Sequence, residues 1–211
     1  MLPSGYRVRL LSGRLDPLLP AWLDLYETAF PYEERVLIST FWRVLEKTET
    51  GAPPDVVLSA LVDSQGNLSG MAAYQMLPSL AAGFLWYLAI APGGRGHGLG
   101  SAYYHFILED VFRSADLLLF EVEIPAHCEE AERRRNAERR IVFYQRNGAA
   151  LLTGIHYMQS VGSHVPPTPM HLMVHARRPT TAEEAFKIAK TLFGDSLSQT
   201  GPLDLIGLEN S

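Results

Sequence analysis

The sequence predicts a single α/β domain, because segments with strand-like and helix-like spacing follow one another along its 211 residues. The most hydrophobic strand candidate, residues 84–91, precedes a glycine-rich loop and a helix. A second buried-looking strand, residues 117–124, ends at a proline and leads into a highly charged helix. Strands that are apolar throughout are usually covered on both faces, so we expect a sheet flanked by helices.

The N-terminal half is expected to contain two helices and a β-hairpin. Residues 16–47 show helical spacing, and Phe30-Pro31 interrupts it, so the pattern predicts one helix on each side. Gly51-Ala52-Pro53-Pro54 predicts a stop before the hairpin, whose turn lies at Ser64-Gln65-Gly66-Asn67. The strand candidates of this half lie at residues 6–11, 56–62, 68–77 and 84–91.

The C-terminal half continues with helices and closing strands. Helical spacing predicts helices over residues 101–114 and 128–144 and an amphipathic helix over 181–193, capped by Thr180 or Thr181. Residues 194–211 are punctuated by Gly, Pro and Ser, so we expect a mobile tail. The remaining strand candidates lie at residues 117–124, 149–160 and 170–177. We therefore expect one domain over residues 1–178, with a helix and tail over 179–211 attached to it.

Composition and charge exclude several classes of protein. The single cysteine, Cys128, excludes an intrachain disulfide and any cysteine-based metal cluster. The net charge of −5 disfavours nonspecific binding to nucleic acid or anionic membranes. No segment reaches the roughly 20 apolar residues of a membrane span, and residues 1–11 lack the apolar core of a signal peptide. We therefore expect a cytoplasmic protein with no nucleic-acid or membrane partner.

Glycines occupy alternate positions from 94 to 100, between the central strand candidate and a helix. Without Cβ atoms the backbone N–H groups can converge on a ligand, and the helix dipole favours an anion such as a phosphate. The structural alternative is a tight turn, for which one or two glycines would suffice. A Walker loop does not fit, since no lysine lies between residues 48 and 186. The dinucleotide pattern fails because Leu99 and Ser101 stand where its third glycine would be.

The segment Arg95-Gly96-His97-Gly98-Leu99-Gly100 matches the Arg/Gln-x-x-Gly-x-Gly/Ala loop of the GNAT family of N-acetyltransferases, and the chain resembles that family. Three further segments are similar to the family's pattern, in the same order: LWYLAIAP before the loop, FEVEI after the loop helix, and RRIVFYQRNGA near the end. In the last segment Tyr144 precedes Gly148 at the spacing typical of the family. One departure is Ala137, where the family often has asparagine, with Asn136 one position earlier.

The resemblance implies a mixed, mostly antiparallel sheet of about six to seven strands, flanked by helices and splayed where acetyl-CoA enters. The backbone of Leu88, Ala89 and Ile90 is implied to pair with the pantetheine arm and to polarise the thioester carbonyl. The glycine loop is implied to hold the pyrophosphate. Its residues are Arg95, Gly96, His97, Gly98, Leu99, Gly100 and Ser101.

Acetyl transfer to an amine needs a base for the nitrogen and an acid for the departing sulfur. The resemblance implies that Tyr144 is the acid, and an ordinary core tyrosine is the alternative. Glu121 and Glu123 alternate on a strand, so they point to one face, where an unpaired carboxylate is costly. We predict Glu123 as the base, directly or through water, with Glu121 toward the acceptor. Alternatively, one of them pairs with an arginine from residues 133–140 and does no chemistry.

The motif FPYEER at residues 30–35 lies between the first two helices, where family members commonly build the acceptor pocket. Tyr32, Glu33 and Glu34 are therefore predicted to meet a cationic amine, and a solvated helix start is the alternative. The charged run 129–140 predicts a solvent-exposed helix with Glu–Arg pairs. The histidines lack carboxylates or thiols at ligand spacing, so we expect no metal site.

Together these features predict an acyltransferase that moves an acetyl group from acetyl-CoA to a primary amine by direct attack in a ternary complex, without a metal. The acceptor is a small molecule or peptide, and the acidic balance favours a cationic one over an anionic one. The alternative is a non-catalytic module that binds or senses acyl-CoA. The resemblance also leaves open a homodimer formed through the closing strands.

Overall fold

The computed structural model describes residues 2–50, 55–94 and 96–207. The helices are α1 (Leu19–Ala29), α2 (Ile38–Glu49), α3 (Leu99–Val111), α4 (Ala131–Arg146) and α5 (Ala182–Phe193). The strands are β1 (Arg7–Leu10), β2 (Val56–Val62), β3 (Leu68–Leu77), β4 (Ala82–Ile90), β5 (Leu117–Glu123), β6 (Ala150–Gln159), β7 (Thr168–Ala176) and β8 (Leu197–Ile206). None of these helices is long and apolar enough to cross a membrane.

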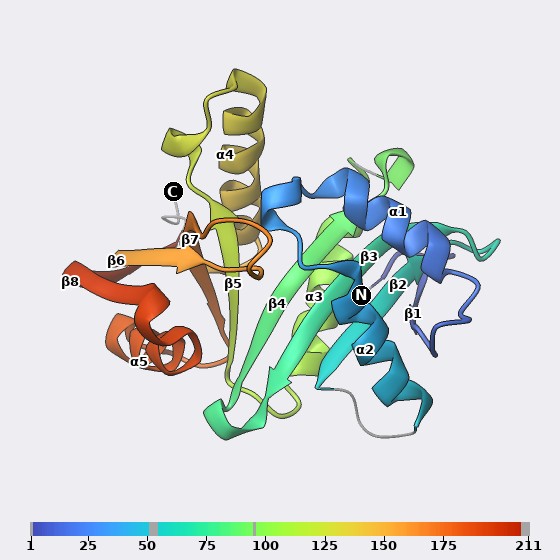
Figure 1. Ribbon diagram of the computed structural model, residues 1–211, viewed down its shortest axis with the longest axis horizontal. Helices are drawn as coiled ribbons and strands as arrows, with labels where there is room; N and C mark the ends of the chain where they lie inside the picture. The colour runs from blue at the N-terminus through green and yellow to red at the C-terminus, as the bar shows by residue number, and fades with distance from the viewer. Residues whose placement is uncertain (1, 51–54, 95, 208–211) are drawn as a thin grey trace.

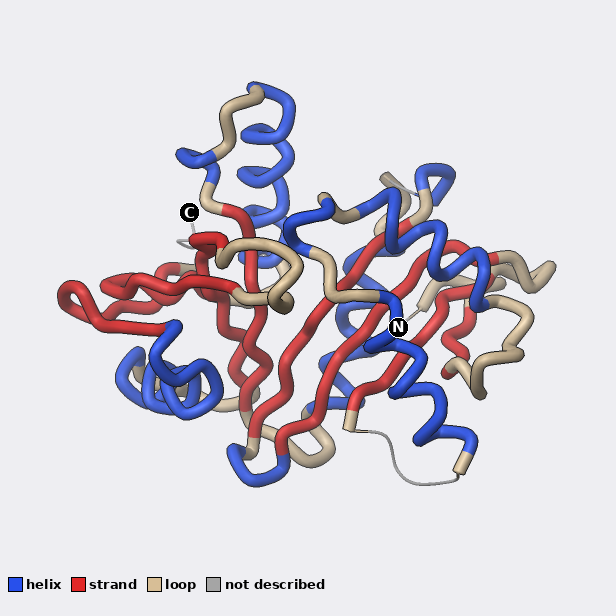
Figure 2. The backbone as a smooth tube through the Cα atoms, in the orientation of Figure 1, coloured by secondary structure: helices blue, strands red, loops and turns tan. Residues whose placement is uncertain are grey.

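All the described strands belong to one sheet, in the order β1-β2-β3-β4-β5-β7-β6-β8 (Figures 1 and 2). Neighbouring strands are antiparallel except β4 and β5, which run parallel and are connected through α3. The predicted mixed, mostly antiparallel sheet flanked by helices is confirmed. Within the described residues it has eight strands instead of the expected six to seven.

Helices cover both faces of the sheet. On one face α1 and α2 lie over β2 and β3, and α5 lies over the far end near β6 and β8 (Figure 1). Trp22 of α1 is fully buried there and donates its indole N–H to the Ser59 carbonyl at 2.8 Å. On the opposite face α3 and α4 pack against β4 and β5. Between α2 and α5 no described helix covers the middle of the first face, and β4 and β5 lie open there (Figure 1).

The expectation of a mobile tail over residues 194–211 is wrong for residues 197–206, which form β8 at the edge of the sheet. Residues 208–211 lie outside the described residues. β8 pairs with β6 in two segments, and Leu197 is fully buried under α5. Gly201 and Pro202, which suggested a loop, stand between the two paired segments. Gly154 of β6 approaches this bend so closely that a Cβ atom there would lie 2.1 Å from the Pro202 carbonyl oxygen.

The other expected elements are confirmed, with ends that differ by a few residues. Helix α3 begins at Leu99, two residues before its predicted start, because Gly98 is its N-cap and Gly100, the last glycine of the loop, already belongs to its first turn. Thr181 caps α5 in a capping box with Glu184, as the sequence pattern indicates. The stop predicted at Gly51-Ala52-Pro53-Pro54 lies outside the described residues.

Candidate active site

The parallel strands β4 and β5 separate near the middle of the sheet. They pair only from Ala82–Leu117 to Leu85–Phe120, although β4 continues to Ile90 and β5 to Glu123 (Figure 2). The divergence begins at Trp86, an extra residue that the β3–β4 register skips. Such a β-bulge bends its strand and re-aims a side chain. β4 and β5 are therefore not paired with each other beyond Leu85 and Phe120.

A small inner cavity of about 40 Å³ lies where the two strands separate. It opens beside an outer cleft of about 400 Å³ on the face between α2 and α5. Four residues line both spaces: Trp86, Tyr87, Glu121 and Gln159. The outer cleft therefore adjoins the gap between the strands.

The glycine loop follows β4 directly and ends in helix α3. Gly96 and Gly98 have φ values of +84° and +74°, a conformation that side chains with a Cβ rarely adopt. A Cβ at either position would meet no atom within 4 Å, so the loop faces open space. Leu99, Gly100 and Ser101 start the helix, and their N–H groups precede the first intrahelical bond, from Ala102 to Gly98. The loop thus presents backbone donors at the positive end of a helix dipole.

The other described residues of the loop differ in how far they are exposed to solvent. His97 is exposed, whereas the Leu99 side chain is buried in the core and could offer only its backbone to a ligand. Gly100 packs against the ring of Phe143 in α4, where a Cβ would lie 3.4 Å from the ring. Arg95 lies outside the described residues. Asn136 is exposed on α4 and Ala137 is fully buried, so the helix presents no asparagine at the family's usual position.

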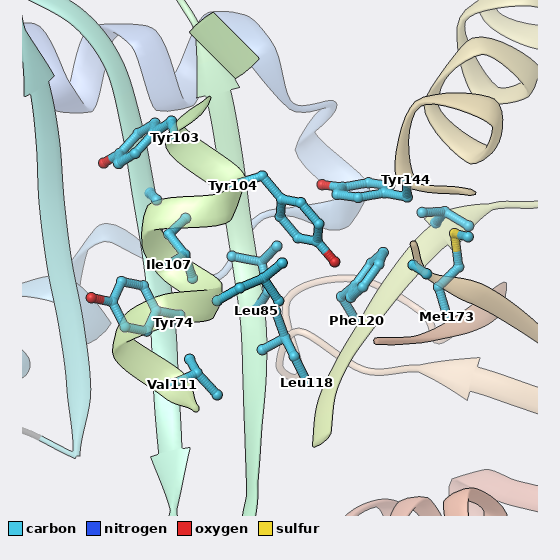
Figure 3. Packing of buried hydrophobic residues seen from close by; sticks show 14 of the residues in the cluster. Tyr74, Leu85, Tyr103, Tyr104, Ile107, Val111, Leu118, Phe120, Tyr144 and Met173 are labelled. Carbon is cyan, nitrogen blue, oxygen red and sulfur yellow. The ribbon is translucent and has the colours of Figure 1, made fainter. Parts of the chain in front are cut away.

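Tyr144 projects from α4 toward the separation of the strands (Figure 3). Its ring packs 4.3 Å from Phe120 and 5.2 Å from Tyr104, measured between ring centroids. Its side chain lines the inner cavity, and its hydroxyl forms no hydrogen bond with the described part of the chain. Burial raises the pKa of Tyr144 to about 12, with Arg140 opposing the shift, so the hydroxyl keeps its proton at neutral pH.

Glu121 lies across the inner cavity on β5. Its two carboxylate oxygens accept hydrogen bonds from the Tyr157 hydroxyl and the Gln159 side-chain amide of β6. Burial raises the pKa of the Glu121 carboxyl, and these two hydrogen bonds oppose the shift. A carboxylate with a raised pKa, facing a cavity, is suited to accept a proton.

Glu123 points to the same face, as its alternation with Glu121 indicates, but it lies in an ion-pair cluster. Its carboxylate contacts Arg133 at 2.9 Å and Arg140 at 2.7 Å, and it is only 6% exposed. It lines neither the inner cavity nor the outer cleft. This matches the alternative that the sequence left open, in which one of the two glutamates pairs with an arginine from residues 133–140.

The FPYEER segment is tied into the same cluster. Arg133 contacts Glu33 at 2.8 Å and Glu34 at 3.2 Å, in addition to Glu123. Glu34 is buried rather than solvated, and it lines the inner cavity. Burial, and then the Glu123 carboxylate, raise the pKa of Glu34 to about 7, against the effects of Arg140 and Arg133. Tyr32 is 57% exposed and packs its ring against His164.

Sequence reasoning missed Trp86, Tyr157 and Gln159, which line the outer cleft. No local motif marks these residues. Trp86 faces the cleft because of the bulge in β4, and Tyr157 and Gln159 stand on β6, which only the order of strands in the sheet brings near β5. The charged run 129–140 is not wholly solvent-exposed as its pattern predicts, because Arg133 and Arg140 pair with Glu123, which the sequence left open as an alternative. Among the described residues no cluster of His, Cys, Asp and Glu could hold a metal ion.

The model of the Acetyltransferase (GNAT) family matches residues 19–127, just over half of the chain. No curated protein sequence matches the chain.

Several solved structures share the fold. A protein from Bacteroides thetaiotaomicron described as a GNAT-family acetyltransferase has a TM-score of 0.66 at 22% identity, over 89% of this chain and 98% of that one. One from Desulfovibrio desulfuricans, also described as a GNAT acetyltransferase, has a TM-score of 0.56 at 19% identity, covering 81% and 98%. The dodecameric spermidine N-acetyltransferase of Vibrio cholerae has a TM-score of 0.58 at 14% identity, covering 83% and 95%. Because these structures are only 14–22% identical to this chain, the similarity shows a shared fold and nothing more.

Proposed function

This chain belongs to the GNAT acetyltransferase family, and from that premise we propose that it moves an acetyl group from acetyl-CoA to a primary amine by direct attack in a ternary complex. The observation that carries the proposal is the inner cavity. It lies where β4 and β5 separate, and it is lined by both Tyr144, a hydroxyl that can donate a proton, and Glu121, a carboxylate that can accept one.

The residues around the glycine loop fit acetyl-CoA. The open loop and the first turn of α3 offer N–H groups to a pyrophosphate, and those of Gly96, Gly98, Leu99, Gly100 and Ser101 would hold it. Beyond Leu85, where β4 no longer pairs with β5, the backbone of Leu88 and Ala89 would hold the pantetheine. When bound, acetyl-CoA would supply an acetyl thioester, with its carbonyl carbon as the electrophile and its sulfur as the leaving group.

We propose Glu121 as the base, in place of the sequence prediction of Glu123. Glu121 lines both the inner cavity and the outer cleft, and burial raises its pKa toward that of a working base. Glu123 is enclosed by two arginines, and both of its oxygens are in ion pairs. We therefore assign Glu123 to holding Arg133 and Arg140 in place.

Tyr144 is proposed as the acid. It keeps its proton at neutral pH, since burial raises its pKa to about 12, and its hydroxyl is free of hydrogen bonds to the described residues. As the N–C bond forms and the C–S bond breaks, the nitrogen loses a proton to Glu121 and the sulfur gains the Tyr144 proton. The products are an amide and a thiol; Tyr144 then regains a proton from solvent, and Glu121 releases one to solvent. An acceptor that arrives as an ammonium ion first releases one proton to solvent.

The first test is calorimetric titration of the purified protein with acetyl-CoA, with desulfo-CoA and ATP as comparison ligands. Micromolar binding of both CoA species without binding of ATP supports the proposed cofactor site. The second test is Tyr144→Phe, which we expect to bind acetyl-CoA normally and to lose at least tenfold in kcat, since a general acid contributes about 10²–10⁴-fold. Normal acetyl-CoA binding with no transfer to a broad amine panel by the wild type would instead support a non-catalytic acyl-CoA-binding module.

A further inference from the structure

The outer cleft combines apolar walls with polar groups, among which Gln75, Ser160 and Ser196 are neutral. Its walls carry aromatic and aliphatic side chains from β4, the β6–β7 segment and α5, among them Phe84, Trp86, Val161 and Phe193. Its volume of about 400 Å³ falls in the range of small-molecule sites, about 300–1,000 Å³. Its polar end is formed by Glu121, Tyr157 and Gln159, where the cleft meets the inner cavity.

Gln159, which lines both the outer cleft and the inner cavity, carries an acceptor that no described residue uses. Its side chain is 8% exposed, and its amide N–H₂ group donates to Glu121. Its Oε1 atom is buried and has no hydrogen-bond partner among the described residues. A buried carbonyl oxygen without a donor costs free energy, so a ligand that brings an N–H group there would be favoured.

The charge of the cleft is that of a single carboxylate. Apart from its tyrosines, Glu121 is the one ionisable group among the described lining residues. Glu33, Glu34 and Glu123 are paired with Arg133 and Arg140 and do not line the cleft.

The neighbouring hollow does not offer a second anionic site. It shares Gln75 and Trp86 with the outer cleft and continues past α2 to Arg43, Lys47 and Asp55. Asp55 is paired with Lys47 at 3.1 Å, and the hollow therefore carries a net positive charge through Arg43. A second ammonium group of a long polyamine would find no free carboxylate in the cleft and a cation in the adjoining hollow.

We propose that the acceptor is a primary amine with one positive charge and an apolar, preferably aromatic, body. Its nitrogen is held between the Glu121 carboxylate and Gln159 Oε1, and its body packs on Trp86, Phe84 and Phe193. This inference rests on the proposed function and specifies which class of primary amine is the acceptor. Aromatic faces attract both apolar groups and a nearby ammonium, so the walls favour such a molecule over a polycation.

The experiment measures kcat/KM with acetyl-CoA for 2-phenylethylamine, n-butylamine, phenylalanine and spermidine. We expect 2-phenylethylamine to exceed spermidine and phenylalanine at least tenfold, because a second ammonium or a carboxylate has no partner in the cleft. Spermidine as the best acceptor would overturn the inference and leave the acetyltransferase function standing.

A binding measurement separates the inference from catalysis. Calorimetric titration of 2-phenylethylamine and spermidine into protein saturated with desulfo-CoA needs no turnover. Preference for 2-phenylethylamine without acetylation of any amine supports the inference and overturns the proposed function. Failure of both amines to bind and to be acetylated overturns both.

Gln159→Leu and Gln159→Glu test the polar end. The leucine variant should weaken 2-phenylethylamine binding at least fivefold while acetyl-CoA binding is unchanged. The glutamate variant adds a second carboxylate and should shift the spermidine to 2-phenylethylamine ratio at least tenfold toward spermidine. Gln145→Leu is the matched control: this half-buried α4 residue donates to the Ile206 carbonyl and lines neither the cleft nor the inner cavity, so its loss should change neither 2-phenylethylamine binding nor the acceptor ratio. Unchanged ratios in both Gln159 variants would show that Gln159 does not contact the acceptor.

Discussion

Replacing Glu34 with glutamine is expected to stabilise the protein at about pH 8 and to flatten its stability across neutral pH. Glu34 is 5% exposed, and its carboxyl contacts Arg133 at 3.2 Å. Burial and the Glu123 carboxylate raise its pKa from 4.5 to about 7 in the folded protein. The ionised form is therefore less favourable in the folded state than in the unfolded chain, in spite of the two nearby arginines.

The size of the effect follows from the two pKa values. Between 4.5 and about 7 the folded state binds more protons than the unfolded state, so stability falls as the pH rises through this window. The full shift corresponds to about 3 kcal/mol at pH values above both. Glutamine resembles the protonated carboxyl in shape and carries no charge. Allowing for the lost contact with Arg133, we expect Glu34→Gln to gain about 2 kcal/mol at alkaline pH and almost nothing at acidic pH.

Urea unfolding of the wild type and the variant at pH values from about 5 to 8 measures this difference. Glu33→Gln in the same turn is the matched control. The backbone and Arg133 lower the pKa of Glu33, and its ionised form therefore stabilises the fold above its ordinary pKa. Its removal should cost a few tenths of a kcal/mol at neutral pH, because the pair is about 40% exposed. Loss of stability in Glu34→Gln at pH 8, or a pH slope equal to that of the wild type, would refute the reasoning.

Three further predictions concern the base, the loop and the edge strand. Glu121→Gln should lower kcat/KM by about 10²–10⁴-fold, whereas Glu123→Gln should mainly lower the free energy of unfolding. A large loss of kcat/KM in Glu123→Gln with little loss in Glu121→Gln would restore Glu123 as the base. Gly98→Ala and Gly66→Ala both place a Cβ at positive φ and should each cost about 1–2 kcal/mol, but only Gly98→Ala should weaken acetyl-CoA binding in calorimetry. Gly154→Ala should detach β8 from β6, and hydrogen exchange should show faster exchange of the β8 amides; unchanged protection would contradict the close approach.

The sequence predicted those parts of the site that depend on local spacing. The glycine loop and Tyr144 each stand in a segment whose own pattern indicates strand, loop or helix, and the family and the fold that they implied are confirmed. The edge strand was missed for a physical reason. Gly201 and Pro202 favour a loop locally, but the free edge of β6 and the buried Leu197 stabilise a strand around them.

The choice between Glu121 and Glu123 depends on contacts that no local pattern contains. Both side chains point to one face of β5, as their alternation predicts. What separates them is the partner each meets. Tyr157 and Gln159 reach Glu121 from β6, and Arg133 reaches Glu123 from α4. Two carboxylates two residues apart thus have different chemistry because strands and helices distant in sequence surround them differently.

The site's position follows from the single parallel pair in the described sheet. Parallel strands end at the same edge, so the glycine loop after β4 and the segment leading to α4 after β5 lie at one end of the sheet. Antiparallel neighbours would have carried these two segments to opposite ends. The bulge at Trp86 then separates the strands below that edge, and the same side chain lines both the inner cavity and the outer cleft. Under the proposed function, this one extra residue in β4 would let an acyl donor and an acceptor reach the same gap from different directions.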